Sequence, residues 1–192
     1  MNLKQKRIGF VITGSFCAFK KTIIELKKIV KLGAKVVPIM SENSYTLDTK
    51  YGKAEEFKKE IEEITNTKIL HTIQEVEPLG PNDILDILVV APATANTIAK
   101  LANDIIDTPA VMAVKSHLRK NRPVVIAISA NNGLSSAAQN IGKLFDMKHY
   151  YFVPFGQSNP ITKPHSIAFD PSYLIKTIEY ALDREQIQPI LL

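Results

Sequence analysis

Short apolar runs without polar alternation constrain the fold of this chain more than any other feature. Four of them occur, at residues 7–13 (RIGFVIT), 35–40 (KVVPIM), 87–91 (ILVVA) and 123–128 (PVVIAI). A strand that is apolar on both sides is covered on both faces, as the strands of parallel sheets are. The segments between these runs carry apolar residues at helical spacing, at 20–32, 94–103, 109–118 and 135–144. Strands that alternate with helices predict an α/β fold with a doubly wound, mainly parallel sheet.

The remaining segments extend this pattern within a single domain. Residues 52–65 predict a charged, exposed helix, whereas 66–83 contain Pro78, Gly80 and Pro81, which break regular elements. A last strand is expected at 149–153, a polar, proline-bearing loop on the substrate side at 154–170, and a closing helix at 171–184. A chain of 192 residues has the size of one domain. We therefore predict one domain, with a core at about 7–153 and a C-terminal helix and tail at 171–192.

The charge distribution argues against nucleic acid and membrane as partners. The net charge is +5, but Lys27, Lys28 and Lys31, and Lys58 and Lys59, share mixed helix faces with glutamates. The basic cluster His117, Arg119, Lys120 and Arg122 has no interleaved aromatic residues. No apolar run reaches the roughly 18 residues of a membrane span. The single cysteine, Cys17, and a start that lacks a signal-peptide pattern favour the cytoplasm. A modest positive surplus suits a small acidic substrate or a phosphate.

Unusual residues follow the predicted strands at the edge where open α/β sheets bind ligands. These segments are Gly14-Ser15-Phe16, Ser41-Glu42-Asn43, Ala93-Thr94-Ala95-Asn96 and Ser129-Ala130-Asn131-Asn132. Small side chains allow a ligand to approach the backbone closely, and hydroxyls and amides at a helix start suit an anion. A plain strand–helix connection, with Thr94 or Asn96 as the N-cap, is the alternative for the third segment. We predict a ligand site at this edge. We predict no metal site, because the four histidines are scattered and no ligand motif accompanies them.

Three stretches resemble the flavoprotein family of flavin-containing cysteine decarboxylases. They are GSFCAFK at 14–20, MSEN at 40–43 and APATANTIAK at 91–100, within a similarity that spans about 7–145. The resemblance implies a Rossmann-like three-layer sheet and an FMN at the strand ends, which in the family commonly lies between subunits of a trimer. A trimer-based homo-oligomer is therefore expected. The implied cofactor-binding residues are Gly14, Ser15, Phe16, Ser41, Asn43, Ala93, Thr94, Ala95, Asn96, Thr97, Ser129 and Ala130.

The resemblance departs from the family pattern at the catalytic residues. Pro78 occupies the position of the family's catalytic histidine, and the nearest histidine is His71. Asn131 falls on the family's active-site asparagine, where an amide can hold a substrate carboxylate or steady a developing negative charge. We therefore assign Asn131 the catalytic position. The alternative is an asparagine in a turn before Gly133.

The whole pattern is most similar to a branch of the family that oxidises a dihydropyridine dicarboxylate to the aromatic diacid. Such a branch implies an oxidoreductase subunit whose partner resembles a dehydrogenase that holds NAD(P). For the small dicarboxylate substrate the candidate contacts are Asn132, Lys163 and His165. Two alternatives remain open at this point. One is a free-standing FMN-dependent decarboxylase of a cysteine-type substrate that uses His71, and the other is a non-catalytic flavin-fold scaffold.

Overall fold

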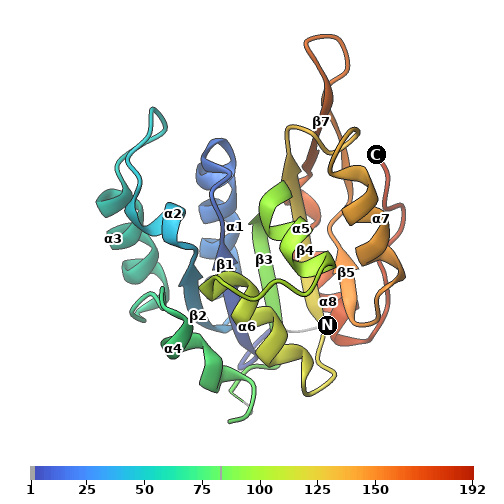
Figure 1. The fold of residues 1–192 in the computed structure, drawn as a ribbon. Coiled ribbons are helices and arrows are strands. Elements are labelled where there is room, and N and C mark those ends of the chain that lie inside the picture. The colour runs from blue at the N-terminus through green and yellow to red at the C-terminus, as the bar shows by residue number, and fades with distance from the viewer. Residues whose placement is uncertain (1–2, 83) are drawn as a thin grey trace.

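A computed structural model describes residues 3–82 and 84–192 as three layers, with one sheet between two layers of helices (Figure 1). The sheet order is β2-β1-β3-β4-β7-β6, and β5 also pairs with β4. The strands are β1 (Arg7–Ile12), β2 (Lys35–Met40), β3 (Ile87–Ala93), β4 (Val124–Ala130), β5 (Tyr150–Phe152), β6 (Phe155–Asn159) and β7 (Lys163–Phe169). Strands β1 to β5 pair in parallel. The predicted doubly wound, mainly parallel sheet is confirmed.

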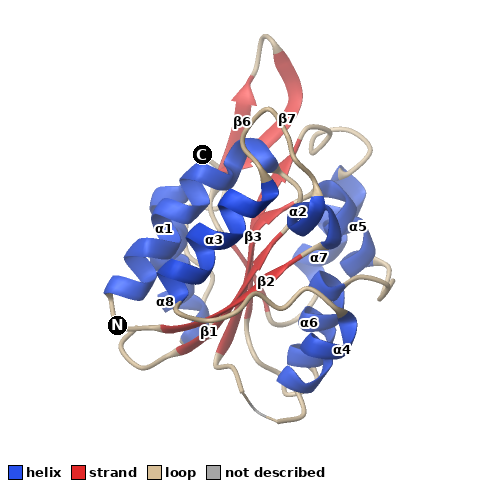
Figure 2. Ribbon diagram, turned by 90° about the vertical axis from the view of Figure 1, so that its left-hand side faces the viewer, coloured by secondary structure: helices blue, strands red, loops and turns tan. Residues whose placement is uncertain are grey.

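Helices cover both faces of the sheet, which explains why the central strands are apolar throughout. Figure 2 shows the sheet edge-on, with α1, α3 and α8 on one side and α4, α5, α6 and α7 on the other. Every residue of β3 is buried, and β1 is buried beyond Arg7. The helices are α1 (Phe19–Lys31), α2 (Glu42–Thr46), α3 (Ala54–Thr65), α4 (Ile73–Val76), α5 (Ala95–Ala102), α6 (Pro109–Leu118), α7 (Ala138–Asp146) and α8 (Leu174–Leu182). No helix in the described part of the chain is long and apolar enough to cross a membrane.

Helix α1 illustrates how the sequence sets these layers. Its buried residues include Phe19, Ile23, Leu26 and Ile29, which recur at helical spacing and face the sheet. Gly33 follows the helix with a φ of +85°, a left-handed conformation that glycine adopts without a Cβ penalty. The chain then turns directly into β2, parallel to β1. The periodicity therefore determines the helix face, and the glycine allows the tight return.

The segment 154–170 is a β-hairpin, so its prediction as a loop was wrong. Strand β7 runs antiparallel to β4, with Ala130 opposite Ile167, and β6 pairs with β7. Phe155, Ile167 and Phe169 are buried, whereas the distal half of the hairpin is exposed. That exposed, polar half projects from the body of the molecule in Figure 1. Because its residues are polar, the sequence shows no apolar strand pattern there. Consequently, β5 is not the last strand.

Residues 66–83 are also more regular than expected. Thr72 and Glu75 form a capping box that begins α4: the Thr72 side chain accepts from the Glu75 backbone, and the Glu75 side chain accepts from the Thr72 backbone. A short 3-10 helix, η2 (Glu77–Leu79), follows directly and includes Pro78. The prolines and Gly80 shorten these helices but do not prevent them. Asp83 lies outside the described residues.

Candidate functional site

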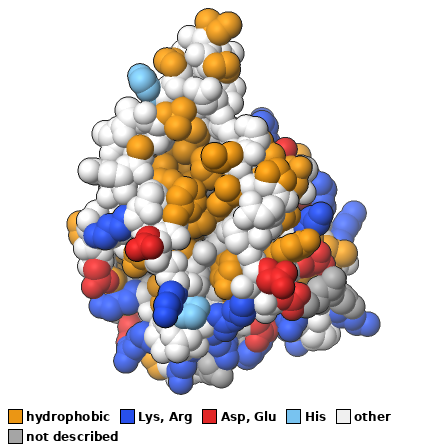
Figure 3. All heavy atoms as spheres, turned by 90° about the vertical axis from the view of Figure 1, so that its right-hand side faces the viewer, with side chains coloured by type: hydrophobic (Ala, Val, Ile, Leu, Met, Phe, Trp, Pro, Cys, Tyr) orange, Lys and Arg blue, Asp and Glu red, His pale blue; other side chains and the backbone are white. Residues whose placement is uncertain are grey.

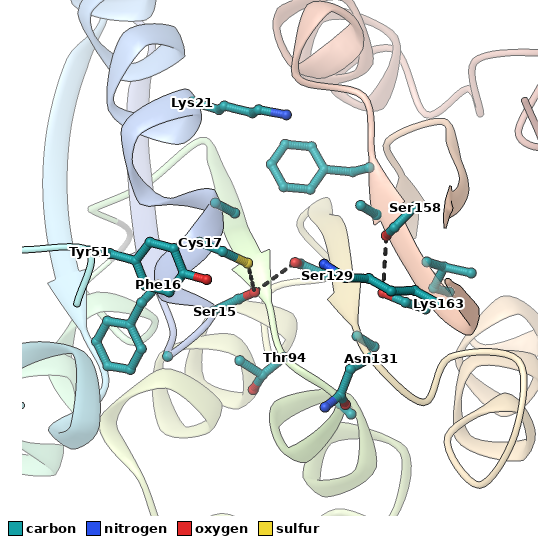
Figure 4. A pocket seen from close by; sticks show the side chains of 18 of the residues that line it. Ser15, Phe16, Cys17, Lys21, Tyr51, Thr94, Ser129, Asn131, Ser158 and Lys163 are labelled. Carbon is teal, nitrogen blue, oxygen red and sulfur yellow. Dashed lines mark hydrogen bonds between the residues drawn. The ribbon is translucent and has the colours of Figure 1, made fainter. Parts of the chain in front are cut away.

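A cavity of about 830 Å³ opens at the carboxyl ends of β1, β3 and β4. Figure 4 shows its walls, which come from the loop after β1, the start of α5, the end of β4 and the β6–β7 hairpin. Three of the four predicted strand-end segments meet there. The predicted residues that line it are Gly14, Ser15, Phe16, Thr94, Ala95, Asn96, Ser129, Ala130, Asn131 and Lys163.

Two serine hydroxyls meet across the end of β3. Ser15 Oγ lies 2.7 Å from Ser129 Oγ, and this bond joins the loop after β1 to the end of β4 (Figure 4). Strand β3 lies between those two strands in the sheet, and it ends in Ala93 with only a small side chain. A hydroxyl has one donor and two acceptor positions, so each serine keeps hydrogen-bonding capacity for a ligand. The pair therefore forms a polar floor beneath the cavity.

Thr94 is fixed by contacts on both of its sides. Its hydroxyl accepts from the Thr97 backbone N–H at 3.2 Å, which makes it the N-cap of α5. Its own N–H donates to Thr13 Oγ1 at 3.1 Å, and the Thr13 hydroxyl donates to the Pro92 carbonyl at 2.7 Å. The N-cap alternative is thus correct for Thr94, yet Thr94 also lines the cavity. Thr94 therefore both caps α5 and forms part of the cavity wall.

Asn131 stands exposed on the cavity wall immediately after β4. The turn that follows is held against the hairpin, because Leu134 N donates to the His165 carbonyl at 3.0 Å. A Cβ on Gly133 would lie 2.2 Å from the Ile167 side chain, so glycine permits this close packing. Asn131 is therefore a turn residue before Gly133 as well as a cavity residue. Asn132 points its amide nitrogen at Ser136 Oγ, 2.8 Å away, and does not line the cavity.

Five further predicted residues lie outside the cavity lining. Ser41 is the N-cap of α2, and its hydroxyl accepts from the Ser44 backbone. Ala93 and Thr97 are buried in β3 and α5. Asn43 is exposed beside the loop after β1, with its Cβ 3.8 Å from the position that a Gly14 Cβ would take. His165 is exposed on β7 and does not line the cavity.

Several lining residues were not predicted from the sequence. They are Cys17, Ala18, Lys21, Tyr51, Ser158, Ser166, Ile167, Ala168, Phe169 and Pro171. Ser158 Oγ and Ser166 Oγ lie 3.0 Å apart on the two strands of the hairpin, and the latter strand also carries Lys163. Lys21 lies one helical turn beyond Cys17, which follows the first predicted strand. This spacing was the only indication in the sequence that Lys21 could reach the strand-end site. The hairpin residues gave none, because their strands were not recognised.

His71 lies away from the cavity, directly after Leu70, which forms an isolated bridge with β2. Its ring stacks on Tyr45 with centroids 3.9 Å apart, and Nδ1 is 3.5 Å from Glu75 Oε2. The His71 backbone N–H donates to the same carboxylate, and this contact lowers the pKa of Glu75 together with the bonds from Thr72. No described residue of the α4 region lines the cavity. His71 is accordingly part of the α4 cap in this chain.

The cavity fits a flat, phosphorylated cofactor in size and chemistry. Its volume lies within the roughly 300–1,000 Å³ of small-molecule sites. Small or hydroxyl side chains form its floor, Phe16 and Phe169 offer aromatic surface, and the charged lining residues are Lys21 and Lys163. The lysines and hydroxyls suit an anionic phosphate, and the aromatic side chains suit an apolar ring system. The described residues contain no group of three or more potential metal ligands.

Comparison with known proteins identifies the family. The family model described as Flavoprotein matches residues 1–170. The B subunit of dipicolinate synthase from Bacillus subtilis (strain 168) is 42% identical over 190 residues, covering 99% of this chain and 95% of that protein. A crystal structure of the corresponding B subunit from Bacillus halodurans has a TM-score of 0.92 at 41% identity and covers 100% of this chain and 98% of that one.

More distant structures share the fold. The FMN-dependent cysteine decarboxylase SpaF has a TM-score of 0.67 at 23% identity and covers 94% of this chain and 97% of that one. The sheet order, the cavity at the strand ends and a family match over most of the sequence agree with one another. The chain belongs to the flavoprotein family.

Proposed function

We propose that this protein is the B subunit of a dipicolinate synthase, which takes part in oxidising dihydrodipicolinate to dipicolinate during sporulation. The observation that carries the proposal is the similarity to the B subunits of two dipicolinate synthases, which extends over nearly the full length of the chains. The oxidation removes two electrons and two protons from the dihydropyridine ring and leaves both carboxylates in place. Lys21, Lys163 and Asn131 suit a substrate of that charge, because they offer two cations and an amide at one cavity.

FMN is the cofactor that the cavity suits. Gly14 to Phe16, Thr94 to Asn96, Ser129 and Ala130 would hold it. When bound, FMN supplies an acceptor for the two electrons of the oxidation. Of the predicted cofactor residues outside the lining, Thr97 contacts Thr94 through its backbone N–H and its hydroxyl, and Asn43 lies beside Gly14. Asn131 is the candidate catalytic residue: its side-chain amide would donate a hydrogen bond to a substrate carboxylate.

The proposed partner is the dehydrogenase-like A subunit of dipicolinate synthase, which would carry NAD(P). A homo-oligomer built from trimers is part of the same proposal, as is a cytoplasmic location. Figure 3 views the side of the molecule that carries α7 and shows a broad apolar area in its upper half, whereas charged side chains gather below. Exposed Phe145 lies on α7. Such an area is typical of a protein–protein contact.

Reconstitution with the dehydrogenase-like partner tests the function. We expect the two purified proteins together to form dipicolinate from dihydrodipicolinate, measured by the ultraviolet absorption of the product, and each alone to be much slower. Asn131→Ala should lower the rate at least about tenfold, since it removes a donor to a substrate carboxylate. Glu56→Gln, exposed on α3 on the other side of the sheet and outside the cavity, is the control and should leave the rate unchanged. A mixture as slow as the partner by itself would contradict the proposal.

The decarboxylase alternative is disfavoured by the position of His71. Its ring stacks on Tyr45 and contacts Glu75, outside the cavity lining. His71→Ala should therefore leave dipicolinate formation intact, whereas a decarboxylase that depends on this histidine would lose its activity. The scaffold alternative predicts a colourless protein that still accelerates the dehydrogenase-like partner after Asn131→Ala. The same reconstitution distinguishes all three.

A further inference from the structure

A second hollow, the α6 groove, is lined by residues of α5, the loop after α5, α6 and the start of β5. Its volume is about 290 Å³, and it shares no lining residue with the 830 Å³ cavity at the ends of β1, β3 and β4, here called the strand-end cavity. Its floor is apolar, formed mainly by Val111, Val114 and Leu118 of α6. Ile105 and Met147 stand at its rim, 48% and 38% exposed. Neither the family's cofactor site nor the proposed reaction uses this groove.

Tyr150, at the start of β5, lines the groove with an unused hydroxyl. The residue is only 9% exposed, yet its hydroxyl forms no hydrogen bond with any described residue. Burial raises the pKa of Tyr150, and the negative charge of Asp104 raises it further, so the phenol keeps its proton. Asp104 also lines the groove. The hydroxyl oxygen itself is open to water, and a bound acceptor can replace that water.

Two cations flank the groove one helical turn apart. Lys115 is exposed on α6 and Arg119 directly after it, and neither forms an ion pair with a described residue. Lys100, at the opposite rim, is already paired with Asp107 at 2.6 Å. Asp104 is the opposing charge and disfavours an anion at its own end of the groove. An anionic group in the groove is therefore expected to lie at the α6 end, beside Lys115 and Arg119.

We propose that the α6 groove binds a small carboxylic acid that carries one aromatic ring or a branched aliphatic group. The apolar part packs on Val111 and Val114, and the carboxylate meets Lys115 and Arg119 while it accepts from the Tyr150 hydroxyl. The volume is at the lower end of the roughly 300–1,000 Å³ of ligand pockets, which limits the ligand to about one ring. This site is independent of the proposed function, because it involves no residue of the strand-end cavity.

Calorimetric titration with benzoate tests the proposal, with benzyl alcohol as the ring without a carboxylate. We expect benzoate to bind more tightly than benzyl alcohol, and Tyr150→Phe and Arg119→Gln each to weaken benzoate binding about fivefold or more. Asp104→Asn should tighten it, since the opposing charge is removed. Asn131→Ala, in the other cavity, should leave it unchanged.

Three results would overturn the proposal. One is equal affinity for benzoate and benzyl alcohol. Another is loss of benzoate binding in Asn131→Ala but not in Tyr150→Phe, which would locate the binding in the strand-end cavity. The third is a change of oligomeric state in Ile105→Glu, measured by light scattering, which would mean that another copy of the chain covers the groove.

Discussion

His117 is the residue whose protonation has the most predictable effect on this protein. It is buried near the end of α6, and Nε2 lies 3.1 Å from the Pro123 carbonyl, to which it donates. Burial lowers the pKa of His117 to about 4, with further lowering by the charges of Arg122 and Arg184. In the unfolded chain the pKa returns to about 6.5. The unfolded state therefore binds the extra proton between these values, and stability falls as the pH falls through that window.

The size of the effect follows from the two pKa values. Between about pH 7.5 and about pH 5 the linkage relation gives a loss of about 2 kcal/mol in the free energy of unfolding from this one side chain. His117→Gln keeps a donor for the Pro123 carbonyl and cannot be protonated. Urea unfolding of both proteins at the two pH values measures the difference, because the contributions of all other groups are common to both. Parallel losses of stability in the wild type and His117→Gln would refute the reasoning.

Three further predictions address packing, the cap and acid stability. Gly80→Ala should lower the free energy of unfolding by more than about 2 kcal/mol, because its Cβ would lie 1.9 Å from the Ser116 carbonyl oxygen. Gly142→Ala, with no atom within 4 Å of the new Cβ, should instead stabilise α7 by about 0.5–1 kcal/mol. Equal shifts of the melting temperature in the two variants would contradict this. Thr94→Val should lower the free energy of unfolding in urea by about 1 kcal/mol and also weaken FMN binding. A variant that loses only stability or only FMN affinity would contradict the assignment of both roles to Thr94. Burial of Asp86 opposes ionisation, but hydrogen bonds from Arg7 prevail and lower the pKa of this carboxyl, so Asp86→Asn should reduce stability above about pH 4 and the difference should vanish in stronger acid.

The sequence predicted the sheet because the relevant signal is local. Each central strand is a run of apolar residues such as 87–91, and each helix carries its own periodicity, so both can be recognised without knowing their neighbours. The strand-end site followed from topology, since parallel strands bring their carboxyl ends to one edge. The β6–β7 hairpin could not be recognised in this way. Only Phe155, Ile167 and Phe169 are buried in it, and the rest of both strands is mainly polar and more exposed.

The same difference explains which site residues were predicted. Ser15, Thr94 and Asn131 follow strands that are evident in the sequence, so their position at the cavity could be inferred. Ser158 and Ser166 reach the cavity only because β7 pairs antiparallel with β4, a long-range contact with no local signature. Ser41 lies at a strand end as predicted, but its hydroxyl is used to cap α2. A residue at a strand end can therefore be predicted to lie at the binding edge of the sheet, but the sequence does not predict whether its side chain points into the cavity.

Flavin binding at the strand-end cavity is measured most directly by an FMN titration followed by visible absorption. We expect the purified protein to take up about one FMN per chain, with the flavin bands shifted from those of free FMN. Ser129→Val should weaken uptake because it removes the partner of Ser15, and Glu56→Gln should not. A spectrum that stays equal to that of free FMN across the titration would contradict the assignment of this cavity.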